Sequence, residues 1–457
     1  MKPTDFSYGN LQEMIDAVGN PVHALRTSQI GPFPFPVVAP KYSNWRDEQR
    51  AWRESVAILN LSHHETDLFV SGPDAVELFS HIGINSFKDF PINRAKQLCC
   101  CNPDGYLITD GLLFHYDDDV YRVAGFPPVV NYVQYHAESG DYDVTYRREE
   151  NSLLREGPPS FFMYQVQGPK ALALMEKVTD GELPEIKFFH IGNLTIHGIP
   201  IRALRHGMAG TPGFEIAGDW QYAEEVMEAL YQAGKGMEVR KIGSRAYPTT
   251  SVESAWFAHP LPAIYDHPEL KGYREWLHTM NLEVIGSLGG SFLSEDIKDY
   301  YVRPEELGYD RFVDFNHDFI GKEALQETIE HPTRKKVTLL WNDEDAAEIV
   351  SSSLLQREDN AKYLDLPCGM YSVFQFDSVQ KDDKHVGVSQ YMIYSANAGK
   401  FMSLAVVDTK LSEPGTALTL LWGEPDSKRP PVEAHTMRRI RTVVAPAPYY
   451  EKTIARD

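Results

Sequence analysis

The sequence predicts a mixed α+β protein, with two α+β units of similar order followed by a C-terminal module made of strands. Segments with helical and with strand periodicity alternate after residue 44, and a similar succession recurs between residues 160 and 255. From Lys335 onward the helical signal fades, and short apolar runs alternate with Gly, Pro and Asp turns at the spacing of an all-β domain. The chain has 457 residues, of which 42% are hydrophobic. That length suggests about two to four domains with a large core.

The N-terminal part contains a proline-rich segment, PFPFPVVAP, over residues 32–40. Each proline fixes φ and disfavours helix in the residue before it, so we expect an extended arm here. The next segment, NWRDEQRAWRESVAIL, opens with Asn44 as a suitable N-cap. It is expected to form a helix that leads into a strand.

The remainder of the first succession is rich in strand formers. ETDLFVSGPDAVELFSHIG is expected to form a strand, a Gly-Pro turn and a helix in which Ala75, Leu78 and Phe79 share one face. GYLITDGLLFHY and DVYRVAGF follow as further strands.

The second succession repeats this order. FFMYQVQ, LTIHGIPIRALRHG and FEIAG are expected to be strands, and GPKALALMEKVT a helix. AEEVMEALYQAG has apolar residues at the helical spacing i, i+3, i+4 and i+7, namely Ala223, Val226, Met227 and Leu230. In the last part of the chain VTLLW, SLAVVD and TALTLLW predict a small barrel or sandwich.

The charge balance excludes several kinds of partner. The formal net charge is -21, from 65 Asp and Glu against 44 Lys and Arg. The field of such a protein repels phosphate backbones and anionic lipid, so we expect neither nucleic acid nor a membrane as a partner. An anionic substrate would need positive charge or hydrogen-bond donors at its own site.

Cysteine usage and the N-terminal residues indicate a cytoplasmic protein with reduced thiols. Cys99, Cys100 and Cys101 are contiguous and Cys368 lies far away, which fits neither a disulfide framework nor a CxxC metal site. The N-terminal stretch MKPTDFSYGNLQEM lacks the apolar core of a signal peptide, and no run of about 18 apolar residues occurs.

Four segments stand out as motifs, in the order NLSHHETDLFVSGPDA (60–75), NPDGYLITDGLLF (102–114), RHGMAGTPGFEI (205–216) and DFIGKEAL (318–325). In this order they resemble the glycine-cleavage aminomethyltransferase family, and the fourth matches that family's C-terminal signature without a change. Any single one could arise on structural grounds, since Gly-Pro helix starts and Gly-rich turns are common. Four in the right order favour the family.

Five other segments point to a narrower branch: SQIGPFPFPVVAP, NSFKDFPINRAKQ, GSRAYP, HPLPAIY and GGSFLSEDIKDYYV. They resemble bacterial tetrahydrofolate-dependent O-demethylases of vanillate and syringate. The resemblance implies two ferredoxin-like α+β units with antiparallel sheets and a C-terminal β-barrel, in a cloverleaf around a central folate site. The implied domains are residues 1–60 with 156–285, then 61–155, a connecting segment 286–334, and the barrel 335–457.

The implied reaction moves a methyl group from an aryl ether to N5 of tetrahydrofolate, without a metal or corrinoid. Such an ether is inert because an unassisted phenolate leaves poorly, so the enzyme must orient the reactants, exclude water and deliver a proton. Tyr247, in GSRAYP, aligns with the catalytic tyrosine of the demethylases and is the predicted general acid. His64 matches a substrate-contacting histidine that could bond the phenolic oxygen, deliver the proton itself or hold Tyr247. His63 would face the other side if this stretch is a strand.

Both Tyr247 and His64 could instead be core residues with satisfied polar groups. The resemblance further implies that the folate contacts Gln165, Glu215 and Trp256 as well as Tyr247. A buried carboxylate at Glu215 would pair with N–H donors of the pterin in a charge-assisted contact. The alternative for Glu215 is a solvated strand residue.

Several positions depart from the family pattern and bear on the substrate. Aminomethyltransferases carry two successive aspartates where this chain has Asp110 and Gly111, and Met208 replaces a tyrosine, a change that the demethylases share. Both departures favour an ether over an amine substrate.

The predicted substrate-binding residues are His64 and three phenylalanines. Phe126 stands where vanillate demethylases have an arginine suited to the substrate carboxylate, and Phe33 and Phe35 replace tyrosines of the arm. An apolar wall would tolerate a second methoxy group, which favours syringate, then vanillate or 3-O-methylgallate.

Two alternative functions stay open. The same fold could act on a sulfonium or a methylated amine, as in dimethylsulfoniopropionate demethylase or the glycine-cleavage protein, or it could bind folate without methyl transfer. The favoured hypothesis is a cytoplasmic methyltransferase, a monomer or small homo-oligomer, whose partners are a small aromatic substrate and tetrahydrofolate.

Overall fold

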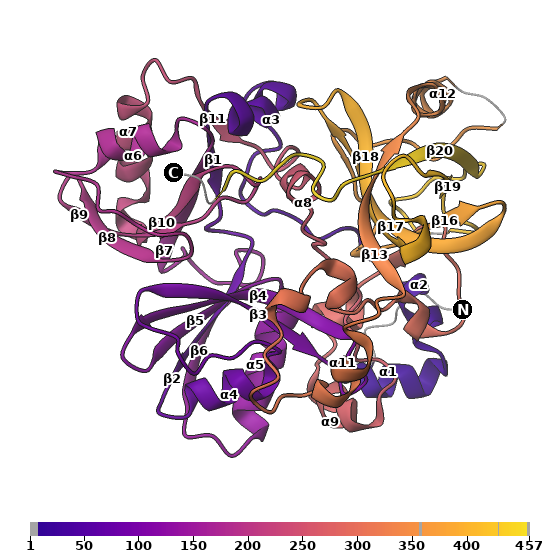
Figure 1. Ribbon diagram of the computed structural model, residues 1–457, viewed down its shortest axis with the longest axis horizontal. Coiled ribbons are helices and arrows are strands. Elements are labelled where there is room, and N and C mark those ends of the chain that lie inside the picture. Colours follow the sequence, from indigo (N-terminus) through magenta and orange to yellow (C-terminus); the bar gives the residue numbers. More distant parts are fainter. Residues whose placement is uncertain (1–7, 356–358, 428, 455–457) are drawn as a thin grey trace.

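The computed structural model describes residues 8–355, 359–427 and 429–454. They form three lobes around a common centre (Figure 1). Two lobes combine a sheet with helices, and the third is a β-barrel. The predicted fold class, α+β with largely antiparallel sheets and a C-terminal barrel, is confirmed.

The first lobe is built on a six-stranded sheet with the order β11-β1-β7-β10-β9-β8. Its strands are β1 Val56–Asn60, β7 Phe161–Gln167, β8 Ile191–Ile196, β9 Ile199–Arg205, β10 Gly213–Asp219 and β11 Val239–Ile242. β1 and β11 run parallel, and the other neighbours run antiparallel. The helix α3 (Trp45–Glu54) leads into β1, and the side chain of Asn44 caps it by accepting from the N–H of Arg46 at 3.1 Å.

Strand β7 shows how this sheet divides its side chains. Phe162, Tyr164 and Val166 are buried against the helices α6 (Ala171–Val178) and α7 (Ala223–Ala233). Successive side chains of a strand point to opposite faces. The odd-numbered residues of β7 therefore project from the face that these helices do not cover. That inner face is turned toward the centre of the molecule (Figure 1).

The second lobe has a five-stranded antiparallel sheet with the order β3-β4-β5-β2-β6. Its strands are β2 Thr66–Ser71, β3 Arg94–Cys101, β4 Leu107–Asp117, β5 Val120–Gly125 and β6 Thr145–Glu149. The helices α4 (Ala75–Ile82) and α5 (Pro127–Ser139) cover one face. On the other face Ala95 and Phe114 share a buried cluster with Leu204 of the first lobe. The inner faces of the two sheets therefore meet.

Segments far apart in the sequence complete the second lobe. The N-terminal helices α1 (Leu11–Val18) and α2 (Pro21–Thr27) share a hydrophobic core with Leu68 and Val123 of the sheet. Later helices join them: α9 Lys271–Trp276, α10 Leu282–Ile285, α11 Lys322–Thr328 and the 3-10 helices Pro268–Leu270, Ile297–Tyr300, Glu305–Leu307 and Asp310–Phe312. The domain boundaries given above remain predictions.

The third lobe is a closed barrel. Its strand order is β14-β17-β16-β19-β20-β13-β18, and β18 also pairs with β17, which closes the ring. The strands are β13 Arg334–Trp341, β14 Cys368–Gly369, β16 Asp377–Lys381, β17 Lys384–Ser395, β18 Lys400–Asp408, β19 Ala417–Trp422 and β20 Arg438–Ala445. Of the two predicted arrangements, barrel and sandwich, the barrel is the one found.

The helix α12 (Asp343–Leu354) is an element that the sequence did not predict. It buries only Ala346, Ile349 and Ser352, so its apolar periodicity is weak. Its start is set by Asn342, whose side chain accepts from two backbone N–H groups of the first turn.

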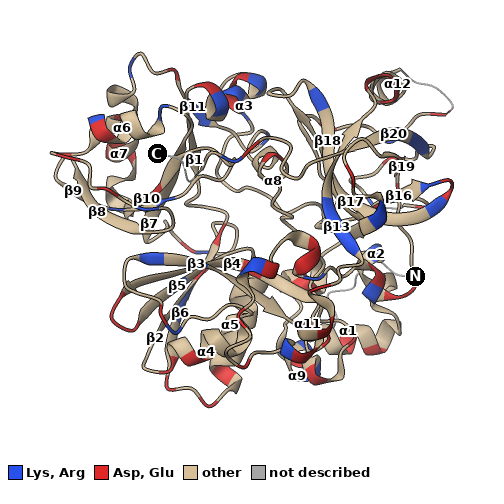
Figure 2. Ribbon diagram, viewed as in Figure 1, with Lys and Arg blue, Asp and Glu red and all other residues tan. Residues whose placement is uncertain are grey.

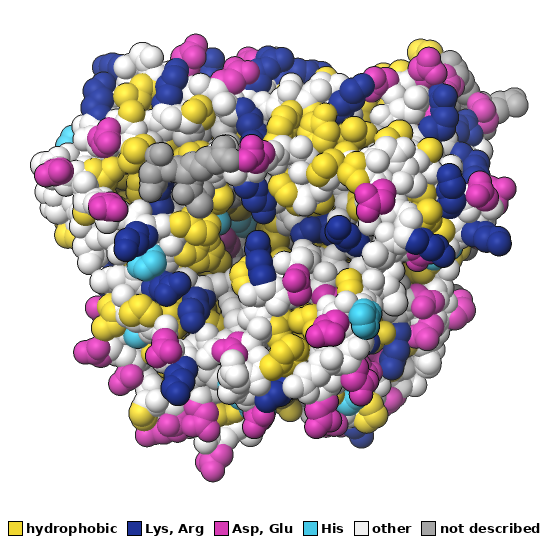
Figure 3. Space-filling view, viewed as in Figure 1, with side chains coloured by type: hydrophobic (Ala, Val, Ile, Leu, Met, Phe, Trp, Pro, Cys, Tyr) yellow, Lys and Arg dark blue, Asp and Glu magenta, His cyan; other side chains and the backbone are white. Residues whose placement is uncertain are grey.

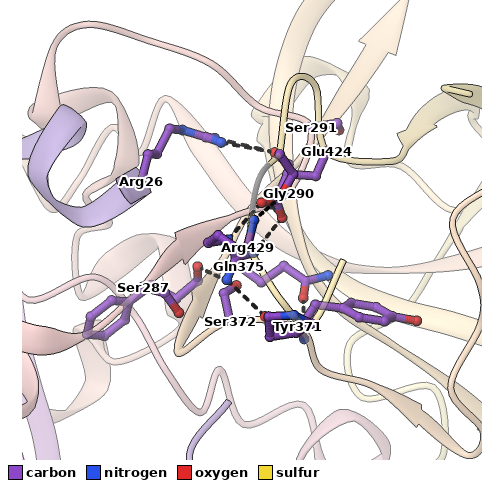
Figure 4. Close-up of polar contacts among 12 residues, drawn as sticks. Arg26, Ser287, Gly290, Ser291, Tyr371, Ser372, Gln375, Glu424 and Arg429 are labelled. Atoms are coloured by element: carbon purple, nitrogen blue, oxygen red, sulfur yellow. Dashed lines mark hydrogen bonds and ion pairs between the residues drawn. The ribbon is translucent and has the colours of Figure 1, made fainter. Parts of the chain in front are cut away.

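A polar seam joins the barrel to the preceding chain where β12 (Leu288–Gly289) pairs in parallel with β15 (Phe374–Gln375). The N–H of Gly290 donates to the Glu424 carboxylate at 3.1 Å, and Arg429 binds that carboxylate through Nε and Nη2 at 2.8 and 2.6 Å (Figure 4). Glu424 and Arg429 are 4% and 2% exposed. This desolvated, bidentate pair fixes the position of the barrel at the seam.

Acidic and basic side chains lie on all three lobes, and Lys and Arg also occur along β13, on the side of the barrel nearest the other lobes (Figure 2). In the described part of the chain no helix has the length and apolar character needed to cross a membrane.

Candidate active site

Tyr247 and His64 are in contact at the centre of the molecule. Tyr247 lies just before α8 (Thr249–Ser254), and His64 lies in a turn that precedes β2. The Nε2 of His64 is 2.9 Å from the hydroxyl oxygen of Tyr247. Phe35 packs on both rings, with centroid distances of 5.2 Å to His64 and 4.8 Å to Tyr247. Three predicted site residues from separate segments therefore meet.

Burial keeps His64 neutral. The residue is 8% exposed, and burial, followed by the charge of His63, lowers its pKa to about 3. A neutral imidazole has one N–H, and Nδ1 of His64 is sealed from solvent without a partner in the described chain. Buried N–H groups without an acceptor are rarer than buried acceptors without a donor. The tautomer with the proton on Nε2, which donates to the oxygen of Tyr247, is therefore favoured.

Tyr247 keeps its own proton. Burial, followed by the charges of Glu65 and Glu215, raises the pKa of its hydroxyl well above the ordinary value. The sulfur of Met208, a weak acceptor, is 3.9 Å from the hydroxyl oxygen. With Nε2 of His64 as a donor, the phenolic proton is available to a ligand atom.

His63 occupies different surroundings from His64, but not for the expected reason. Residues 62–64 form a turn, because β2 begins only at Thr66, so the strand condition for the opposite orientation of His63 is not met. The Nδ1 of His63 is 2.9 Å from the hydroxyl oxygen of Ser152, and its ring meets that of Trp220 edge-on at 5.5 Å.

Gln165 and Glu215 lie directly opposite each other on β7 and β10, and both side chains project from the inner face of the first sheet. Gln165 is fully buried; its Nε2 donates to the backbone oxygen of His206 at 2.8 Å, and its Oε1 has no partner in the described chain. Glu215 is 7% exposed, and burial raises its pKa to about 7. An unpaired amide oxygen beside a buried carboxyl fits a ligand that supplies N–H donors.

Arg122 is surrounded by acids at the same place. It is 1% exposed, its Nε donates to Asp67 at 2.7 Å, and its Nη2 is 3.8 Å from Glu65. Burial, followed by the charge of Glu215, raises the pKa of Glu65 to about 8. Because Arg122 is already paired with Asp67, Glu65 and Glu215 together retain a proton at neutral pH.

Trp256 is tied to Asp110. Its Nε1 donates to Oδ2 of Asp110 at 3.1 Å, and the same oxygen accepts from the Gln97 amide at 2.5 Å and the Tyr309 hydroxyl at 3.3 Å. Trp256 is 37% exposed, so part of its indole remains open to a ligand.

The barrel contributes a basic group near Asp110. Lys336 of β13 donates to the backbone oxygen of Ala255 at 2.7 Å. Burial, followed by the charge of Lys452, lowers its pKa to about 7, while Asp110 acts in the opposite direction. All three lobes therefore take part in the central site.

Phe33 and Phe126 contact each other edge-on, with a centroid distance of 5.3 Å. Phe126 is the N-cap residue of α5 and also lies 4.4 Å from the ring of His259. Phe33, Phe35 and Phe126 are half-buried. They form an apolar wall that starts at Tyr247.

Gly111 has no room for the second aspartate of the aminomethyltransferase pattern. A Cβ atom at this position would lie 2.8 Å from Cγ1 of Val129 and 2.9 Å from the backbone oxygen of Ala124. Asp110 is therefore the carboxylate that β4 presents at this point.

A hollow opens where the three lobes meet, and basic and apolar side chains are visible around it (Figure 3). Glu65, Asp67 and Arg122 are part of the central cluster but were not predicted. Arg122 had a usable signal, because it is the one charged residue inside the apolar segment VYRVAG. Glu65 had no signal in the sequence beyond its place next to His64.

Comparison with known proteins identifies the relatives of this chain. The chain is 40% identical over 443 residues to a syringate O-demethylase from Sphingobium sp., covering 96% of each chain. It is 32% identical over 400 residues to a sesamin methylene transferase from Sinomonas sp., covering 84% of this chain and 83% of that protein. The family described as GCVT N-terminal domain matches residues 31–259.

The chain belongs to the aminomethyltransferase family. It is an enzyme of the methyltransferase class. The aminomethyltransferase fold is also that of the crystal structure of glycine cleavage system aminomethyltransferase T from Bartonella henselae, with a TM-score of 0.60 at 15% identity. That similarity covers 89% of this chain and 90% of the other.

Proposed function

We propose that this aminomethyltransferase-family enzyme is a tetrahydrofolate-dependent O-demethylase of a methoxylated aromatic acid. The observation that carries the proposal is the pairing of a protonated Tyr247 with a neutral His64 that leaves the phenolic proton available. A phenol in that state is suited to protonate an ether oxygen as its bond to the methyl carbon breaks. The identity of 40% to a protein named syringate O-demethylase supports the same reaction class.

The proton inventory of the reaction assigns a task to each residue of the pair. Tetrahydrofolate supplies N5, the nucleophile that takes the methyl group. Tyr247 donates its proton to the ether oxygen, so the leaving group departs as a phenol rather than a phenolate. His64 stabilises the tyrosinate through its Nε2–H. The methyl acceptor would lose one proton in the overall reaction, and Tyr247 would regain the proton that it donated. The number of protons is therefore balanced.

The inner face of the first sheet fits the pterin of tetrahydrofolate. Glu215 would accept N–H donors of the pterin, and Oε1 of Gln165 would gain the donor that it lacks. Glu65 can hold the proton of the carboxyl pair, which leaves Glu215 ionised. The open part of Trp256 would pack on a flat portion of the cofactor.

An aromatic ether is favoured by the wall beside Tyr247. Phe33, Phe35 and Phe126 can pack on an aromatic ring and on a methoxy group, and they offer no hydrogen bond to a phenolic hydroxyl. Among methoxylated acids we therefore rank syringate first, then vanillate or 3-O-methylgallate. The name of the Sphingobium relative supports placing syringate first.

The decisive experiment is an end-point assay of the purified protein with tetrahydrofolate and each of the three acids. We expect syringate to give 3-O-methylgallate and 5-methyltetrahydrofolate in equal amounts. Folate binding by calorimetry without product from any of the acids would overturn the proposal in favour of a folate-binding protein or of another methyl donor.

A further inference from the structure

The apolar wall of the site ends at one polar ring. Phe35 contacts Tyr247, and Phe33, two residues earlier on the arm, meets Phe126 edge-on at 5.3 Å. The ring of Phe126 lies 4.4 Å from that of His259, at an interplanar angle of 34°. All five residues are half-buried, and the contacts Tyr247–Phe35 and Phe33–Phe126–His259 place Tyr247 and His259 at the two ends of this wall.

We propose that His259 binds the carboxyl group of the aromatic substrate, and that Tyr391 holds His259 in the required orientation. The inference rests on the proposed function, because it names the group that recognises the acid end of that substrate. The phenylalanines of the wall offer no hydrogen bond, so a carboxyl group placed beyond them needs a polar partner.

The hydrogen bonds around His259 define its tautomer. The hydroxyl of Tyr391 has one proton and two neighbours, the backbone oxygen of Val373 at 2.8 Å and Nδ1 of His259 at 2.5 Å. A carbonyl only accepts, so this hydroxyl donates to Val373 and accepts from the Nδ1–H of His259. Gln390 donates to the backbone oxygen of His259 at 2.6 Å. The ring is thus held with Nδ1 protonated.

The other nitrogen of this ring is available to a ligand. In the described residues Nε2 of His259 has no hydrogen-bond partner, and it is not among the side-chain atoms sealed from solvent. Neutral His259 presents a lone pair at Nε2 that accepts from the O–H of a carboxylic acid, and protonated His259 donates Nε2–H to a carboxylate. Both descriptions contain one imidazole, one carboxyl group and one shared proton.

Binding an ionised acid should therefore take up a proton from solvent. Burial is the one cause that shifts the pKa of His259, and it lowers that pKa to about 4, so the free ring is neutral at pH 7. The elements around the ring present Phe126 at the N-cap of α5 and Tyr391 and Gln390 from β17, none of which carries a charge at that pH. A bound carboxylate would supply the opposite charge that favours the protonated ring.

Proton uptake can be measured on the wild-type protein without any variant. Calorimetric titrations of syringate into the full-length enzyme at pH 7, in buffers of different ionisation enthalpy, should report uptake of roughly one proton per substrate. The neutral methyl ester of the same ring should bind without uptake. Equal heats in all buffers for syringate would overturn the inference.

The substitution His259→Gln keeps a polar side chain but cannot titrate. We expect it to abolish the uptake and to raise KM for syringate about tenfold, with kcat within about twofold of wild type. The matched control is His331→Gln, an exposed histidine outside the central site, which should retain the wild-type KM, kcat and proton uptake. A His259→Gln enzyme with wild-type KM and wild-type proton uptake would overturn the assignment.

These outcomes are distinct from a failure of the proposed function. If syringate binds with His259-dependent proton uptake but no demethylated product forms, the reaction is wrong and the binding role stands. If product forms with no dependence on His259, the reaction stands and this assignment is wrong. Absence of binding by all three acids would overturn both.

Discussion

The Nε2 of His64 lies 2.9 Å from the hydroxyl oxygen of Tyr247, although 183 residues separate them in the chain. The histidine comes from the turn before β2 and the tyrosine from the segment before α8. The pair therefore exists only in the assembled molecule, and the proposed proton donor depends on tertiary packing as well as on two side chains.

Replacing Tyr247 by phenylalanine removes the proposed proton donor and keeps the ring that packs on Phe35. We expect kcat for the ether to fall about 10²- to 10⁴-fold, because general acid catalysis is lost. Folate affinity should change less than about twofold. Assays of 5-methyltetrahydrofolate and calorimetry measure the two effects. Unchanged turnover would remove Tyr247 from the mechanism and favour a leaving group that needs no acid, such as a sulfonium.

His64 should contribute to the acid sensitivity of the fold. Its pKa is about 3 in the folded protein against 6.5 in the unfolded chain, so only the unfolded chain binds this proton between those pH values. Stability that is present above pH 6.5 is therefore lost as the pH falls through this window. His64→Gln, which retains an N–H for Tyr247, should lose less free energy of unfolding between pH 7 and pH 4. Urea titrations at each pH give the comparison, and parallel profiles would contradict it.

Glu65 should have the opposite effect on the pH dependence of stability. Its pKa is about 8 in the folded protein against 4.5 in the unfolded chain, so the folded protein holds a proton that the unfolded chain has lost. The associated stability is present at low pH and is lost as the pH rises from 4.5 to 8. At pH 8.5 Glu65→Gln should be more stable than wild type by at least about 1 kcal/mol.

The control for that substitution is Glu150→Gln, since Glu150 pairs with Arg148 outside the central cluster. Thermal melts of all three proteins at pH 5 and pH 8.5 provide the measurement. The prediction fails if the difference between Glu65→Gln and wild type is the same at both pH values.

Gly111→Ala tests the crowding on β4. Its Cβ would meet Val129 and the backbone oxygen of Ala124 at less than 3 Å. We expect a loss of about 1–3 kcal/mol in the free energy of unfolding, which is typical of overpacking. The double variant with Val129→Ala should recover part of it, because one of the two contacts is relieved. Additive losses in the double variant would show that Val129 is not the obstacle.

Motif and periodicity were enough to propose the candidate site residues that lie in single segments. The alternation of β7 places Phe162, Tyr164 and Val166 in the helix-covered core and leaves Gln165 for the opposite face. Tyr247 was predicted because GSRAYP resembles a known motif. These inferences needed only neighbours in the sequence.

The residues that sequence reasoning missed are those whose roles depend on contacts between segments. Glu65 matters because Glu215, from another strand, lies near it, and a shared proton cannot be read from either residue alone. His259 acquires its tautomer from Tyr391, which lies 132 residues later. The helix α12 was missed for a local reason, since its start depends on the cap at Asn342 rather than on an apolar stripe.

The seam at Gly290 limits what can be exchanged between relatives of this enzyme. Gly290 has φ +94, and a side chain there would collide with the backbone of Phe376, while the adjacent carboxylate of Glu424 is committed to Arg429. A chimera that takes its barrel from another protein would need counterparts of β15, Glu424 and Arg429 in the new barrel that fit the glycine of the recipient. Because Lys336 of the same barrel reaches the central site, such a graft would also alter the charge at the candidate active site, so barrel and body would have to be exchanged together.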